Sequence, residues 1–305
     1  MLVYLTACHR VTRRGWQEIA RTLFGIEMSL GSVCKLHQEV SQSLEPSHEQ
    51  ARDALSAEAV LNVDETGWWS MGKRMWLWIF VASRMAFFTI SGSRGSKVLK
   101  QIIGAVFSGI LCSDRFSAYN ACHKGIRQVC WAHIIRDLRG VRHACRSPDA
   151  VRFSKWMLKE IGRIFGVWHA FRDEQLDRRT LVRKSVPIRA RMNKCLQIYE
   201  HSADHEVRTT AKGLLKFWEH LFTFLEYEDV EPTNNSAERG IRPAVQWRKI
   251  CFGNRSERSE LLTARLLTAT RSCILQQRNP FEFLVDSIDA RRKGLPFPSL
   301  LTPSR

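Results

Sequence analysis

Segments with the composition of β-strands lie between residues 60 and 130, and the sequence on either side carries the spacing of amphipathic helices. Aromatic and β-branched residues favour strands at residues 60–63, 75–82, 85–90, 109–113 and 127–130. The second and third of these are separated only by Ser83-Arg84, which predicts a hairpin, and residues 96–103 suit a helix. A block of short strands between helical segments predicts an α/β fold.

Helical segments precede and follow this block. Residues 12–44 predict two helices, because Gly25 ends the first and Ser29 can cap the second, and this is the outline of a helix-turn-helix. Residues 1–55 hold six basic and six acidic residues, so DNA contact and a packing or dimerising role both stay open for this hairpin. Residues 147–228 show long amphipathic patterns without strand signals, which indicates a helical module.

The last part of the chain begins with a loop around Pro232. After it we expect a short helix through Glu238, a basic segment, a longer helix at residues 257–277 and a last short helix at residues 280–288. The proline-containing tail from Gly294 is expected to be frayed.

The chain of 305 residues has a formal net charge of +17, and residues 121–180 and 229–305 contribute +7 and +5 of it. Such an excess indicates a polyanionic partner, nucleic acid before a membrane. No segment reaches the roughly 18 uncharged apolar residues of a membrane-spanning helix, and the start lacks the basic region of a signal peptide. Nine cysteines without a CxxC pair fit a reducing cytoplasm better than a disulfide framework.

Two aspartates follow apolar strand segments. Asp64 comes after residues 60–63, and Asp114 comes after residues 110–113. If these strands are neighbours, the carboxylates meet at one edge of the sheet, and converging carboxylates are the ligands that Mg²⁺ or Mn²⁺ prefer. Two such ions ~4 Å apart can activate a nucleophile and stabilise the leaving oxygen at a phosphodiester. Taken as a pair alone, the aspartates are better explained as turn formers or helix caps.

A third acidic residue, Glu238, lies in a basic stretch. Asn235 with Glu238 three residues later fits a helix capping box, which requires no metal. The basic residues that follow are Arg239, Arg242, Arg248 and Lys249. A helix that presents a carboxylate flanked by arginines suits a metal site that faces phosphates.

Four strings of the sequence resemble the insertion-sequence 66 family of DDE transposases. They are Val63-Asp64-Glu65-Thr66-Gly67, Ser113-Asp114-Arg115 with Tyr119, Cys130-Trp131-Ala132-His133, and Thr233-Asn234-Asn235-Ser236-Ala237-Glu238-Arg239 with Arg242-Pro243 and Arg248-Lys249. They occur in the family's order, and the resemblance extends from the hairpin at residue 12 to the last helix. The string around Asn235 is specific, whereas Asp-Glu-Thr-Gly alone is weaker.

The resemblance implies an RNase H-like fold, in which a mixed sheet and one helix hold an acidic triad. Asp64, Asp114 and Glu238 match the triad positions and would bind two Mg²⁺ or Mn²⁺ ions. The 124 positions between the last two acids would contain an all-helical insertion. Strand alternation would point the neighbouring Glu65 to the face opposite Asp64. The implied domains are a helical hairpin (1–55), the first part of the core (56–146), the insertion (147–228) and the rest of the core with the C-terminal helices (229–305).

Such a protein would cleave DNA at the ends of a mobile element and join the freed 3′-hydroxyl to target DNA. Holding two DNA ends implies a homo-oligomer, and element-encoded accessory proteins are further expected partners. Arg239, Arg242, Arg248 and Lys249 would bind phosphates. Trp68 and Trp69, expected in a loop after the strand, would stack on unpaired bases, whereas Trp76 and Trp78 follow the strand period and suit the core.

Cys130 and His133, with Arg136 nearby, form a candidate accessory group. Cys130-x-x-His133 resembles a Cys/Asp-x-x-His signature of transposases with helical insertions, and packing or a role near the scissile phosphate both stay open. A zinc site would recruit Cys112, Cys122 and His123, but this spacing matches no standard zinc pattern. The pair His133 and Arg136 also suggests tyrosine recombination, which we discount because the next tyrosine, Tyr199, is far downstream.

Family members generally carry an N-terminal extension with a coiled-coil-like stretch and zinc-binding cysteines. The sequence starts directly before the hairpin, so independent target recognition is not expected. The alternative to a transposase is a non-catalytic DNA-binding remnant or regulator derived from one, and the presence of all three acids argues against it.

Overall fold

The computed structural model describes residues 1–123, 125–145 and 147–301. These residues belong to two compact units that alternate along the chain. Unit 1 comprises Met1–Leu111, Phe116–Gly125 and Asn235–Arg305, and unit 2 comprises Cys112–Arg115 and Ile126–Asn234.

The described strands form one sheet in the order β3-β2-β1-β4-β5. They are β1 (Val60–Ser70), β2 (Lys73–Val81), β3 (Ala86–Ser91), β4 (Ile110–Ser113) and β5 (Arg127–Val129). β1 pairs antiparallel with β2, and β2 pairs antiparallel with β3. The predicted α/β class and the hairpin at Ser83-Arg84 are therefore confirmed.

Strand β1 is longer than its apolar run indicates. Its ladder with β2 continues from Asn62 opposite Val81 to Ser70 opposite Lys73, across a two-residue turn. Hydrogen bonds to β2 keep the backbone extended although the side chains after Val63 are mostly not aliphatic. The prediction that the strand stops before Asp64 and continues as a loop is therefore wrong.

Helices surround the strands of unit 1. They are α1 (Leu2–His9), α2 (Arg13–Phe24), α3 (Leu30–Ser43), α4 (Glu45–Ala54), α5 (Ser96–Ile103), α6 (Ser117–Cys122), α12 (Asn235–Cys251), α13 (Glu257–Leu275) and α14 (Pro280–Lys293). The two predicted helices of the hairpin are confirmed, because α2 ends before Gly25 and the Ser29 hydroxyl accepts the Ser32 N–H at 3.0 Å. α3 packs against α13 and α14, so the packing role of the hairpin is observed and DNA contact stays a prediction.

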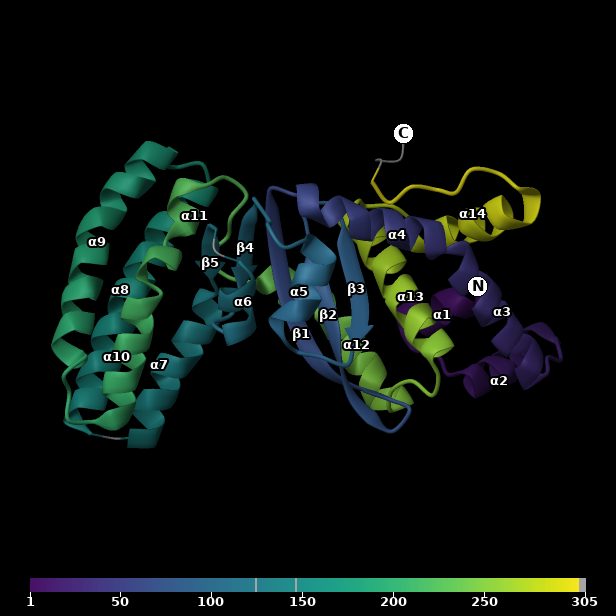
Figure 1. The fold of residues 1–305 in the computed structure, drawn as a ribbon, viewed down its shortest axis with the longest axis horizontal. Helices are drawn as coiled ribbons and strands as arrows, with labels where there is room; N and C mark the ends of the chain where they lie inside the picture. The colour runs from purple at the N-terminus through teal and green to yellow at the C-terminus, as the bar shows by residue number, and fades with distance from the viewer. Residues whose placement is uncertain (124, 146, 302–305) are drawn as a thin grey trace. The chain divides into compact units, whose positions relative to one another are not determined.

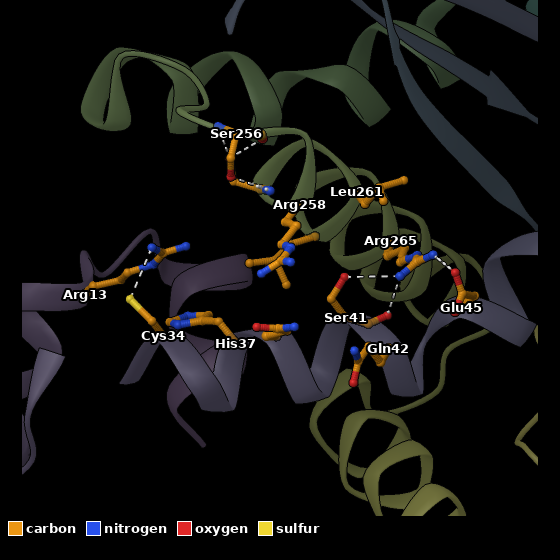
Figure 2. Close-up of a pocket in the computed structure, with 13 residues that line it drawn as sticks. Arg13, Cys34, His37, Ser41, Gln42, Glu45, Ser256, Arg258, Leu261 and Arg265 are labelled. Carbon is orange, nitrogen blue, oxygen red and sulfur yellow. Dashed lines mark hydrogen bonds and ion pairs between the residues drawn. The ribbon is translucent and has the colours of Figure 1, made fainter. Parts of the chain in front are cut away.

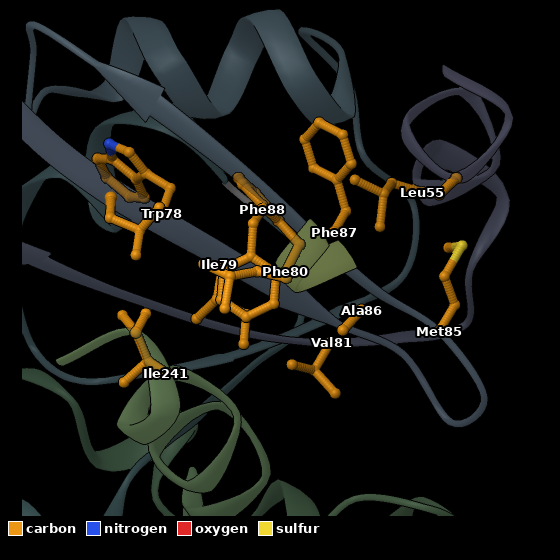
Figure 3. Packing of buried hydrophobic residues seen from close by; sticks show 14 of the residues in the cluster. Leu55, Trp78, Ile79, Phe80, Val81, Met85, Ala86, Phe87, Phe88 and Ile241 are labelled. Carbon is orange, nitrogen blue, oxygen red and sulfur yellow. The ribbon is translucent and has the colours of Figure 1, made fainter. Parts of the chain in front are cut away.

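The core of unit 1 lies on both faces of the β1–β3 sheet. α12 packs against β1 and β2, and Figure 3 shows its Ile241 beside Ile79 of β2. Gly240 allows this approach, because a Cβ at that position would lie 2.5 Å from the Cδ1 atom of Ile79. On the opposite face, the ring of Trp78 lies 6.3 Å from that of Tyr119 in α6.

The free edge of β3 is covered by α13, which runs beside it in Figure 1. The backbone N–H of Phe88 donates to the Thr268 hydroxyl at 2.9 Å, and that of Ala86 donates to the Ser272 hydroxyl at 3.1 Å. Side chains of α13 therefore accept hydrogen bonds from backbone N–H groups of β3 with which another strand would otherwise pair.

The tail after α14 is docked, contrary to the prediction that it is frayed. Leu300 is 1% exposed, the Ser47 hydroxyl donates to the Pro298 carbonyl at 2.8 Å, and the Gln276 amide donates to the Leu300 carbonyl. Its backbone finds partners that are remote in the sequence. The last part of the predicted tail, residues 302–305, lies outside the described residues.

Unit 2 is mainly helical. Its helices are α7 (Trp131–Cys145), α8 (Pro148–Arg172), α9 (Arg178–Tyr199), α10 (His205–Lys216) and the short α11 (Thr223–Glu226). α7 to α10 lie side by side in Figure 1, and they bury Phe153, Met157, Leu181, Met192 and Leu214. The helical character predicted for residues 147–228 is confirmed.

His37 of α3 is buried in its neutral form in unit 1. Its Nδ1 lies 3.0 Å from the Val33 carbonyl oxygen and its Nε2 lies 3.3 Å from the Thr6 hydroxyl. Burial and the charge of Arg13 lower its pKa from 6.5 to about 4. His37 therefore binds a proton more readily in the unfolded chain than in the folded protein. The stability that its neutral form provides is fully present above pH 6.5 and is lost as the pH falls toward 4.

When the pH is lowered from about 7 to 5, we expect protonation of His37 to decrease the free energy of unfolding by about 2 kcal/mol. His48, whose pKa is also lowered to about 4 by burial, acts in the same direction. Urea unfolding at several pH values measures this dependence. His37→Gln should flatten it and the same change at exposed His9 should not, whereas an unaltered pH dependence in His37→Gln would contradict the assignment.

Candidate active site

Asp64 and Glu65 are neighbours in β1 whose side chains point to opposite faces of the sheet. Asp64 is paired with Ile79 and Glu65 with Trp78, and directly paired residues of antiparallel strands share a face. Asp64 therefore lies on the face covered by α12, and Glu65 lies on the face of Trp78. The predicted separation of the two carboxylates is confirmed.

Glu65 is held in an ion pair on its own face. Its side chain is 2% exposed, and its Oε1 lies 2.8 Å from the Arg94 guanidinium, while the Tyr119 hydroxyl donates to its Oε2. Arg94 is itself stacked 4.0 Å from the Phe116 ring centroid and 4.7 Å from that of Trp76. Arg94 was not predicted, because no motif marks an arginine in the loop before α5.

Asp64 and Glu238 both belong to unit 1. Asp64 is half-buried, and its Oδ1 accepts the Glu65 N–H at 2.9 Å. Glu238, also half-buried, lies in the first turn of α12, the helix that covers the Asp64 face. α12 begins at Asn235 and Glu238 lies in its first turn, so the capping-box alternative for Glu238 stays open.

The basic residues after Glu238 belong to the same helix, so the predicted short helix followed by a separate basic segment is wrong. Arg239, Arg242 and Lys249 are exposed along α12. Arg248 is half-buried, and its Nη1 donates to the Thr66 hydroxyl at 3.2 Å and to the Gly67 carbonyl. Part of the Arg248 guanidinium is therefore used to attach α12 to β1.

Asp114 directly follows β4, as predicted, and belongs to unit 2. The buried Arg127 of β5 donates through Nη2 to the Ser113 hydroxyl at 2.9 Å and to the Asp114 carbonyl at 3.1 Å. The neighbouring Arg115 is paired with Asp137 of α7. The backbone of Asp114 is thus held by an arginine that sequence reasoning missed, because Arg127 lies in no recognised motif.

Cys130 and His133 lie at the start of α7 in unit 2. Cys130 is 1% exposed, its N–H donates to the Ser113 carbonyl at 2.9 Å, and its sulfur accepts the Asn234 N–H at 3.1 Å. His133 is half-buried in the first turn, and Arg136 is exposed one turn later. Cys130 therefore connects β4, α7 and the segment that precedes α12.

The three additional residues of the zinc alternative are divided between the units. Cys112 belongs to unit 2, whereas Cys122 and His123 belong to unit 1. Burial raises the pKa of Cys112 to about 12, so this thiol stays protonated and behaves as a packed side chain.

The two tryptophans after Asp64 lie in β1 and not in the predicted loop. Trp68 is 1% exposed, and its indole N–H donates to the side-chain oxygen of Asn254. Trp69 is 52% exposed. Only the second ring is accessible for stacking, because strand alternation directs the first into the core.

The chain matches the family described as Transposase IS66 family over residues 2–260. Because this match covers most of the chain, the protein belongs to that family of transposases, and membership implies that it binds DNA. No curated protein matches the sequence. Within the part of the chain that the structure describes, no helix combines the length and apolar composition needed to cross a membrane.

Proposed function

We propose that the protein is a DDE-type DNA transposase with an RNase H-like core, in which Asp64, Asp114 and Glu238 are the catalytic acids. The observation that carries this proposal is the position of Asp64 on the sheet face that α12 covers, with Glu238 in the first turn of that helix. The family match supports it independently.

The donor set suits two Mg²⁺ or Mn²⁺ ions. All three side chains offer hard carboxylate oxygens, and Asp64 and Glu238 are half-buried, which leaves them access to solvent. The rival Glu65 is engaged by Arg94 and Tyr119 on the opposite face. The bound ions would supply Lewis-acid stabilisation of the charge that develops at a phosphodiester.

The reaction that we propose has two phosphoryl-transfer steps. Water attacks the phosphorus at the element end, and the bond to the 3′-oxygen breaks, which leaves a 3′-hydroxyl. That hydroxyl then attacks a phosphodiester of target DNA and displaces a target 3′-hydroxyl. Two DNA ends must be held for this chemistry, so we propose a homo-oligomer at the nucleoid, with element-encoded accessory proteins as further partners.

The DNA contacts that we propose near these acids use side chains of α12 and β1. Arg239, Arg242 and Lys249 are exposed and would bind phosphates. Arg248 keeps only part of its guanidinium for DNA, because it donates to β1. Trp69 is available to stack on an unpaired base, whereas Trp68 acts by anchoring β1 to Asn254.

The test is Mg²⁺-dependent cleavage and strand joining of DNA that carries the element ends. Asp114→Asn and Glu238→Gln should abolish both reactions and leave DNA binding in place. Activity like that of the unaltered protein in either variant would contradict the triad. DNA binding without cleavage by the unaltered protein would favour the non-catalytic alternative.

Arg127→Lys tests how Asp114 is positioned. Lysine keeps the charge but loses the planar group that reaches both Ser113 and Asp114, so we expect cleavage to fall by about 10- to 100-fold, as for residues that orient metal ligands. The Mg²⁺ concentration for half-maximal rate should rise, and the affinity for DNA should stay constant. A variant that loses stability but keeps its Mg²⁺ dependence would show that Arg127 only packs.

A further inference from the structure

We propose that a groove of unit 1, between the N-terminal hairpin and the start of α13, binds the phosphate backbone of DNA. We call it the arginine groove. It is built by residues outside the catalytic acids and the basic residues of α12. The proposal rests on the proposed function, since a transposase must hold DNA over a longer stretch than the scissile phosphate.

The arginine groove is made of two adjoining cavities of 440 and 630 Å³. Both are lined by the same side chains at their junction, namely Arg13, His37, Ser256, Ser259 and Leu262. One wall comes from α2 and α3, and the other comes from the α12–α13 turn and α13. The shared lining makes the two cavities one continuous depression.

In the described part of the chain six arginines line the arginine groove: Arg265, which is paired with Glu45, and five others. Arg10, Arg13 and Arg14 come from the hairpin side, and Arg255 and Arg258 come from the other side. Within the described residues, no ion pair joins any of the five to a carboxylate. Figure 2 shows Arg258 between Arg13 at one end of the first cavity and Arg265 at the other.

Among the described residues, the only acidic side chain that lines either cavity is paired with an arginine. Glu45 is paired with Arg265, which also donates to the Ser41 carbonyl at 3.0 Å. His37, at the junction, is neutral near pH 7 because burial lowers its pKa to about 4. The charge inside the groove is therefore that of the five arginines.

Residues 1–55 have a net charge of zero, although three of their arginines line the arginine groove. Three of their six acids have partners outside the arginine groove or at its far end: Glu39 pairs with Arg292, Glu45 with Arg265 and Asp53 with Arg52. Three of their six basic residues, Arg10, Arg13 and Arg14, lie together in the groove. Glu39 and Asp53 are thus paired outside the groove, and Glu45 is paired with Arg265.

Several hydrogen bonds hold the walls in place. The Asn254 amide donates to the Ser259 carbonyl at 2.8 Å and to the Thr263 hydroxyl at 3.0 Å, which orders the turn that carries Arg255 and Arg258. On the hairpin side, the Thr12 hydroxyl accepts the Gly15 N–H at 3.0 Å, and the Trp16 indole donates to the Leu2 carbonyl at 2.7 Å. An ordered row of arginines without carboxylate partners is suited to a polymer of phosphates.

The experiment measures binding of the full-length protein to a fluorescent DNA duplex of roughly 30 base pairs at several salt concentrations. Two variants remove charge from opposite walls, Arg13→Gln with Arg14→Gln, and Arg255→Gln with Arg258→Gln. The matched control, Arg52→Gln with Arg84→Gln, removes the same charge from exposed positions of unit 1 outside the groove. Thermal unfolding verifies that each variant is folded.

Each groove variant should weaken DNA binding by about 30-fold near 150 mM salt, because each lost phosphate contact forfeits the release of about 0.9 counterion. The slope of log affinity against log salt should decrease by about 2 in each groove variant, and the control should stay within about twofold of the unaltered protein. The two groove variants alter different walls of the groove. If one of them does not fold, the DNA affinity of the other still tests the proposal.

Equal losses in the groove and control variants, or unchanged binding in both groove variants, would overturn the arginine groove. The catalytic proposal fails by a different measurement, namely cleavage that survives Glu238→Gln. Either result can occur without the other, so the two failures are distinguishable.

Discussion

Asp64→Asn should abolish DNA strand cleavage and leave the fold intact. Asparagine has the shape of aspartate but lacks the charge that a divalent cation requires, and metal stabilisation of several kcal/mol corresponds to a loss of about 10³-fold or more. Asp64 is half-buried within β1, and its backbone stays in the ladder with Ile79. Cleavage of labelled DNA in Mg²⁺, beside thermal unfolding, measures both effects.

Glu65→Gln is the matched control for this prediction, one residue away on the other face. It removes the charge that pairs with Arg94 inside unit 1, where the Glu65 side chain is 2% exposed. We expect a lower melting temperature and a much smaller loss of cleavage, since the change weakens the bonds of the buried Glu65 side chain to Arg94 and Tyr119 while the Arg94 charge stays in contact with water. If Glu65→Gln abolishes cleavage and Asp64→Asn does not, the assignment of the two acids is reversed.

Gly253→Ala should destabilise unit 1 by about 4 kcal/mol, because backbone strain and the loss of two backbone hydrogen bonds add up. Gly253 has φ of +99°, and a Cβ there would lie 2.0 Å from the Trp69 carbonyl oxygen. The turn would have to move away from β1. That movement breaks the bond from Asn254 N–H to Trp69, at 2.8 Å, and the bond from Met71 N–H to Asn254, at 2.9 Å.

Gly25→Ala is the control for Gly253→Ala, because it introduces backbone strain without a steric conflict. Gly25 also has a positive φ, +64°, but an added Cβ would meet no atom within 4 Å. We expect it to lose only about 1–2 kcal/mol, the cost of a left-handed backbone for an alanine. Equal free energies of unfolding for the two variants, measured in urea, would show that the contact with Trp69 is not limiting.

Much of the candidate site follows from local sequence patterns. Asp114 directly follows β4 as its apolar run predicts, and the opposite orientation of Asp64 and Glu65 follows from the two-residue repeat of a strand. These properties depend on neighbours in the chain, which the sequence displays directly. Their roles in catalysis stay predictions.

The errors share a different physical origin. β1 continues past Val63 because β2 supplies hydrogen-bond partners, and the tail is docked because Ser47 and Gln276 bind its carbonyls. In both cases the local composition is that of a loop. Partners distant in the sequence override this composition, and a pattern restricted to a short window does not contain them.

The sequence by itself determined the family, the α/β class and the positions of the acidic residues along strands and helices. Only the tertiary structure decided which charges and rings are free for DNA. Trp68 is buried against Asn254, 186 positions away, and Arg248 donates to Thr66, 182 positions away. Likewise, three arginines of a hairpin with balanced charge gather in one groove, while Glu39 pairs with Arg292 and Glu45 with Arg265. Burial and ion pairing depend on how far apart residues lie in space. The net charge of a stretch of sequence does not contain these distances.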